Sequence, residues 1–142
     1  EGGMERHRVV DIMAKIEGLQ AGCIETLISG PGLVTLAQHL TGQAYSTEEI
    51  AGNRKSALAN VWSLWCALTA ELLHTLALTC DPDIIVLGGG LSRIPNILDD
   101  LAVAASAAQL SGFNSTHLAL ANGGDASGAL GAAYAAWAEQ ND

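Results

Sequence analysis

The stretch that decides the fold reads DIIVLGGGLS and covers residues 83–92. Its apolar part, residues 84–87, is mostly β-branched and is bounded by proline and glycine, which is typical of a short strand buried on both faces. The three glycines that follow carry no Cβ, so their backbone amides can approach a ligand closely. Because a helix start also favours negative charge, the stretch predicts a nucleotide-binding turn between a strand and a helix.

The same residues fit a purely structural interpretation equally well. A tight strand-to-helix connection with positive φ needs glycine whether or not a ligand binds. The glycine spacing does not match GxGxxG, and no lysine follows as it would in a Walker motif, so a Rossmann or P-loop assignment has little support. On this stretch alone both interpretations stay open.

Two helices are predicted on the amino-terminal side. Ile24, Leu27 and Ile28 are spaced for one helical face. Pro31 disfavours helix at the residue before it, so the first helix is expected to end there. A second helix is then expected over about Gly32–Leu40.

Two further helices are predicted before the deciding stretch. Residues 46–49 read STEE, a capping-box pattern that starts a short helix. The apolar run Ala57–Cys80 is long enough to cross a bilayer, but Asn60, Glu71 and His74 interrupt it. Because a carboxylate inside a membrane is costly, the run predicts a core helix.

The elements after the glycines complete an α/β order. A helix is expected to hold Pro95 in its first turn and to run to about Ala108. The alternation at His117–Ala121 predicts a second strand, and a last helix opens near Asp125. Small residues in that last helix favour close packing against a neighbouring layer. Helix, strand, helix, strand, helix is the order of an α/β fold.

Composition limits the function classes. A chain of 142 residues with 49% hydrophobic and 15% charged residues can bury one core and is not intrinsically disordered. Six Lys and Arg against fifteen Asp and Glu give a net charge of −9, which repels nucleic acid and acidic membrane surfaces. Neither is expected as a partner.

The cysteines and the first residues bear on location. Cys23, Cys66 and Cys80 form no CxxC pair and are odd in number, as expected for reduced thiols in the cytoplasm. Residues 1–20 lack a sustained period and are expected to be loop with a short strand at Arg8–Ile12. They show no secretory leader, so the chain is expected to be a mature or truncated piece.

Isolated polar and aromatic residues have ordinary structural interpretations. Glu25 and Asp125 stand at predicted helix starts, where a carboxylate is stabilised by the helix dipole or caps the helix. Trp62 and Trp65 are expected to pack in the core or against a partner lobe rather than to stack on a sugar. The histidines, His39, His74 and His117, have no ligand-like spacing.

Three separated segments, GCIETLISGPGL, DPDIIVLGGGLS and GDASGALGAA, together resemble the ROK family of repressors, open reading frames and kinases, from about Ala21 to Ala138. They are most similar to bacterial fructokinases and N-acetylglucosamine kinases. The resemblance implies an actin-like, ribonuclease H-like fold in which two lobes clasp a sugar and ATP with Mg²⁺. This chain looks like the C-terminal lobe as a single domain. The family's DxGGT loop and the GNDAN-like segment with the catalytic general base are absent, so no catalytic residue is assigned.

The resemblance also assigns binding residues. Glu25 matches the family glutamate that binds sugar hydroxyls, and Pro31 matches a position beside the nucleotide. Asp125 falls in a glycine-rich motif and is expected to cap a helix and support the lobe. The nucleotide-contacting turn matches Gly88, Gly89, Gly90, Leu91 and Ser92.

The zinc motif of the family is incomplete here. Of its three cysteines only Cys23 is present, because Ile16 and Gly18 stand where the others should be. With His7 this leaves two ligands where a tetrahedral site needs four, so zinc is expected to be absent. Whether His7 or residues 1–4 match the family's ExGH element stays open.

The resemblance therefore implies part of an ATP-dependent kinase for a hexose or amino-hexose, inactive as this chain. Two alternatives are the sugar-sensing half of a ROK transcriptional repressor and a degenerate oligomerisation module. A homodimer is a candidate assembly.

Overall fold

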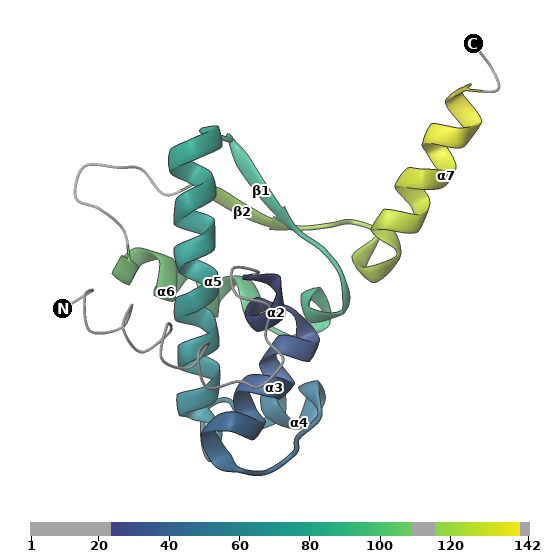
Figure 1. Cartoon of the computed structure of the whole chain (residues 1–142). Coiled ribbons are helices and arrows are strands. Elements are labelled where there is room, and N and C mark those ends of the chain that lie inside the picture. Colours follow the sequence, from purple (N-terminus) through teal and green to yellow (C-terminus); the bar gives the residue numbers. More distant parts are fainter. Residues whose placement is uncertain (1–23, 109–115, 140–142) are drawn as a thin grey trace.

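The computed structural model of the chain describes residues 24–108 and 116–139 (Figure 1). The predicted strand at Arg8–Ile12, together with His7 and Cys23, lies outside these ranges. The elements are α2 (Glu25–Ile28), α3 (Gly30–Thr41), α4 (Thr47–Gly52), α5 (Ala59–Cys80), β1 (Ile84–Leu87), the 3₁₀ helix η1 (Gly90–Arg93), α6 (Ile97–Ala108), β2 (His117–Leu120), the 3₁₀ helix η2 (Gly124–Ala126) and α7 (Ser127–Glu139).

The two predicted strands pair in parallel. Ile84 lies opposite His117 and Leu87 opposite Leu120. Parallel neighbours need a crossover, which α6 supplies between them. The helices and the small parallel sheet are compatible with the predicted α/β class. Both strands therefore end at the same edge of the sheet.

The prediction that β1 is buried on both faces is wrong for the described residues. Ile84 is 46% exposed and Val86 55% exposed. On the opposite face, Leu87 of β1 and Leu118 of β2 pack against the core. In the described ranges the sheet has two strands, and nothing covers its outer face.

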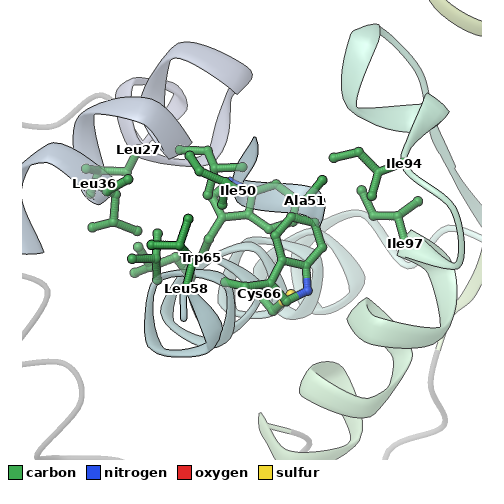
Figure 2. Close-up of a cluster of buried hydrophobic side chains, with 14 of the residues drawn as sticks. Leu27, Leu36, Ile50, Ala51, Leu58, Trp65, Cys66, Ile94 and Ile97 are labelled. Atoms are coloured by element: carbon green, nitrogen blue, oxygen red, sulfur yellow. The ribbon is translucent and has the colours of Figure 1, made fainter. Parts of the chain in front are cut away.

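The long apolar run forms the central helix α5 and buries much of its surface, as predicted (Figure 1). Trp62 and Trp65 are 5% and 2% exposed, and their rings stack with centroids 5.0 Å apart. The Trp65 indole N–H also donates to the carbonyl oxygen of Ile28, 3.0 Å away. Figure 2 shows this core, where side chains from α2, α3 and α4 meet α5 and the start of α6.

Length and composition alone would allow α5 to cross a membrane, and no other helix of the described ranges passes that test. In the fold, 44% of its apolar window is buried. Helices α3 and α6 both pack against α5.

Two helix starts follow the capping rules, one of them at an unexpected residue. Ser46 and Glu49 form the predicted capping box, with Ser46 N–H 2.8 Å from a Glu49 carboxylate oxygen. Helix α3 begins at Gly30, two residues before the predicted start, so that boundary was wrong. Gly30 has no Cβ to collide with the Pro31 ring, and the Ser29 hydroxyl caps the helix by accepting from Gly32 N–H.

We expect Gly32→Ala to destabilise the fold strongly. A Cβ on Gly32 would lie 2.5 Å from the Leu27 carbonyl carbon and oxygen and from the Thr26 oxygen, so backbone would have to move. Overpacking of this kind costs about 3 kcal/mol. Urea unfolding followed by circular dichroism measures the loss.

Gly52→Ala is the matched control, because Gly52 is helical and a Cβ there meets nothing within 4 Å. It should leave stability unchanged or raise it by about 0.5 kcal/mol. Equal stability of Gly32→Ala and Gly52→Ala would contradict the close contact of α2 with α3.

Two predictions about the later helices need correction. Pro95 lies in the turn before α6 and not in its first turn, because Asn96 adopts a φ of 60° and delays the helix to Ile97. Helix α7 projects away from the rest of the chain (Figure 1). It buries no residue of its own in the described part, so the predicted close packing is not present. Within the described ranges, its small residues have no neighbouring layer to approach.

Candidate functional site

The turn after β1 has the positive φ that its glycines predict. Gly89 has φ 80° and ψ −175°, a region that is essentially restricted to glycine. A Cβ on Gly89 or Gly90 would meet no other atom within 4 Å. The described part of the chain therefore leaves the space beside this backbone open.

The first backbone donors of η1 have no acceptor inside that helix. The first hydrogen bond of η1 runs from Ser92 N–H to Gly89 O at 3.1 Å, and the Ser92 hydroxyl donates to the same oxygen at 2.7 Å. Because the first N–H groups of a helix have no partner inside it, those of Gly90 and Leu91 are left for an external acceptor.

A second turn lies beside the first at the carboxyl edge of the sheet. Ala121 N–H, just after β2, donates to Leu87 O at 2.9 Å. A Cβ built on Gly88 would be 3.7 Å from the Ala121 Cβ and 3.9 Å from Gly124 O. The turn after β2 therefore lines the same edge, and carboxyl ends of parallel strands are where α/β proteins bind ligands.

The motif around Asp125 belongs to this second turn. Asp125 lies in η2, directly before α7, and its side chain lies outside what the structure describes. A Cβ on Gly123 would approach the Ser127 hydroxyl oxygen to 2.9 Å and the Leu130 side chain to 3.1 Å. Glycine at this position lets α7 start close to the turn.

The start of α3 lies near η1, which follows the glycine turn. A Cβ on Gly30 would lie 3.9 Å from the Leu91 side chain of η1. Pro31 is the next residue, in the first turn of α3, and is exposed. The structure thus brings the predicted Pro31 position and the predicted glycine turn together.

Glu25 is not joined to this group by any described contact. It is the first residue of α2 and is exposed. That position agrees with a helix-dipole role for the carboxylate.

Sequence reasoning missed Gly30 and the contribution of the turn at residues 121–124. The second could have been found, because two parallel strands must end at one edge. The contact of Gly30 with Leu91 had no local signal.

No metal centre is visible in the ranges that the structure covers. No group of three or more His, Cys, Asp and Glu is placed to hold an ion among those residues. Cys66 is buried and Cys80 is exposed, and both are free. The possible zinc remnants Cys23 and His7 are outside the described residues.

Cys66 has an unusual environment close to Asp100. Burial first, and then the Asp100 carboxylate, raise the pKa of the thiol from 9.0 to about 12, although Arg54 opposes the shift. A buried thiol with a raised pKa is a poor nucleophile.

The pH dependence of stability should report this shift. Because the folded state holds the Cys66 proton more tightly than the unfolded state, its contribution is complete below pH 9 and is lost as pH rises toward about 12. Urea unfolding at increasing alkaline pH should show a steeper loss for the wild type than for Cys66→Ala. Parallel curves for the two proteins would contradict the burial of this thiol.

An edge of parallel strands lined by glycine turns is where α/β proteins typically bind ligands. The chain belongs to the ROK family, whose sequence profile matches residues 18–140. The resemblance seen in the three motifs is therefore confirmed.

The relatives are amino-sugar kinases by name. The chain is 39% identical over 116 residues to "N-acetylgalactosamine kinase AgaK" of Shewanella sp. (strain ANA-3), covering 79% of this chain and 37% of that protein. It is 35% identical over 119 residues to "N-acetyl-D-glucosamine kinase" of Escherichia coli O1:K1 / APEC, covering 81% of this chain and 39% of that protein. The chain thus spans less than half the length of these curated relatives.

Proposed function

We propose that the chain is the nucleotide-contacting C-terminal lobe of an actin-like, ATP-dependent sugar kinase. The observation that carries the proposal is that the turns after β1 and β2 meet at one edge of the sheet and that the start of α3 lies near Leu91, which follows the first of these turns. These segments contain the three family motifs. Each contributes backbone without bulky side chains, as a site for phosphate or ribose requires.

The residues present fit ATP. The space beside Gly89 and Gly90, which a Cβ would occupy, is open, and the N–H groups of Gly90 and Leu91 can donate to anionic oxygens. Ser92, whose hydroxyl donates to Gly89 O, and Pro31 would flank the nucleotide. ATP supplies the phosphoryl group, and its Mg²⁺ would be held mainly by phosphate oxygens and water. Glu25 would bind sugar hydroxyls.

The exposed apolar surface supports the proposal that the chain is one lobe of a larger fold. Leu130, Tyr134 and Trp137 on α7 are 48%, 70% and 65% exposed. Ile84 and Val86 add the outer face of β1. Extended apolar surface of this kind normally packs against more protein. Together with the partial coverage of the relatives, this favours a chain that works beside a second lobe in the cytoplasm.

For the substrate, the names of the relatives favour an N-acetylated amino-hexose over fructose. The test replaces the aligned 37% of the Shewanella kinase with this chain. The folded hybrid should phosphorylate N-acetylgalactosamine or N-acetylglucosamine and lose this activity with Gly89→Val. A folded hybrid that binds these sugars without turnover would favour the repressor-type sensor.

A further inference from the structure

Arg54, in the loop between α4 and α5, bridges three segments through its guanidinium group. Nε donates to Asp100 Oδ2 at 3.0 Å, Nη1 to the Ala51 carbonyl at 2.8 Å and Nη2 to the Pro95 carbonyl at 2.9 Å. The Ala51 carbonyl belongs to α4, Pro95 to the turn before α6, and Asp100 to the first turn of α6. One side chain thus ties the helical core to the region that follows the glycine turn.

The bonds from Arg54 to Asp100 and Ala51 are partly buried, whereas the bond to the Pro95 carbonyl is exposed. The Arg54 and Asp100 side chains are 14% and 24% exposed, and they form an ion pair. Asp100 Oδ2 also accepts from the Trp62 indole N–H at 3.1 Å. The guanidinium carbon lies 5.8 Å from the centre of the Trp62 ring. Partly buried, charge-assisted hydrogen bonds in such a network are stronger than an exposed ion pair.

Pro95 connects this network to the glycine turn. The residue before it, Ile94, is 8% exposed and donates its N–H to Leu91 O at 3.0 Å. Asn96, the residue after it, has a φ of 60°, a left-handed conformation that asparagine adopts more readily than most non-glycine residues. Fixing the Pro95 carbonyl therefore fixes where η1 ends and where Leu91 and Ser92 lie.

We propose that Arg54 is a positioning residue for the nucleotide turn, acting through Pro95 and the start of α6. That the turn binds a nucleotide rests on the proposed function. The connection from Arg54 through Pro95 to the turn rests on the hydrogen bonds alone. Arginine is required because one planar fork serves two carbonyls and a carboxylate, whereas lysine offers a single ammonium group.

The test compares wild-type chain with Arg54→Lys, which keeps the charge, and with Val61→Ala, a core control in α5 that leaves the bridge intact. Amide hydrogen exchange is followed by NMR at Ser92 and Ile94, in or next to η1, and at Thr69 in α5. Arg54→Lys should speed exchange at Ser92 and Ile94 by about tenfold or more, and at Thr69 by less than about twofold. Val61→Ala should speed exchange at Thr69 at least as much as in the turn.

If Arg54→Lys raises the exchange rate equally at all three amides, or at none of them, Arg54 has no positioning role. Titration with Mg·ATP separates this inference from the proposed function. If Arg54→Lys loosens the turn and neither protein responds to Mg·ATP, the positioning of the turn stands and the nucleotide assignment fails. If both proteins bind Mg·ATP with equal affinity, Arg54 does not position a nucleotide site.

Discussion

The purified chain, given Mg·ATP with N-acetylgalactosamine, N-acetylglucosamine, glucose, mannose or fructose, should release ADP at the background rate. Phosphoryl transfer depends mainly on holding both substrates in line, and positioning can contribute a factor of about 10⁵ or more. Absence of a general base costs about 10²- to 10⁴-fold more. This sequence contains neither the DxGGT loop nor the GNDAN-like segment that the ROK resemblance assigns to these tasks.

A coupled ADP-release assay measures this directly. The hybrid with the rest of the Shewanella kinase serves as the positive control. Turnover by the isolated chain that survives a second purification would contradict the proposal that the chain is one lobe of a two-lobed site.

Gly89→Val should abolish most nucleotide affinity in the hybrid kinase. Gly89 faces open space, so no atom of the described chain obstructs the added side chain. A bound nucleotide would lie in that space, and we expect affinity to fall by at least about 100-fold. The valine must also adopt φ 80°, which costs about 1 to 3 kcal/mol of strain.

Two variants separate these effects. Gly90→Ala adds a Cβ in open space without the positive φ of Gly89, so it should weaken ATP binding with little change in thermal midpoint. Val61 is buried, with 2% exposure, so Val61→Ala should lower the thermal midpoint without touching the turn. Isothermal titration with ATP and thermal unfolding give both quantities. If Gly89→Val binds ATP as well as Val61→Ala does at matched stability loss, the turn is merely structural.

Local sequence signals predicted most element positions. The capping box at Ser46 and the strand at residues 84–87 appear where the sequence places them, because their determinants lie within a few residues. The exposure of Ile84 and Val86 was not predictable, since it depends on what covers the outer face of the sheet. The start of α3 was missed because glycine before Pro31 removes the steric conflict that normally ends a helix there.

Part of the candidate site was also predictable, because some of its determinants lie within a few residues of one another. The open backbone at Gly89 follows from a glycine-rich turn after a strand. The approach of Gly30 to Leu91 and the bridge from Arg54 to Pro95 join residues far apart in sequence. Neither has a local pattern, so only the fold could show them.

We propose above all that the carboxyl edge of β1 and β2 binds a nucleotide. An NMR titration of the isolated chain with Mg·ATP tests this most directly, because NMR detects even weak binding. If the edge does bind a nucleotide, chemical-shift changes should be concentrated at Ser29–Gly32, Gly88–Ser92 and residues 121–124. Mg²⁺ and a sugar added without ATP should give far smaller changes. Saturating shifts confined to other residues, or no shifts at millimolar Mg·ATP, would contradict this proposal.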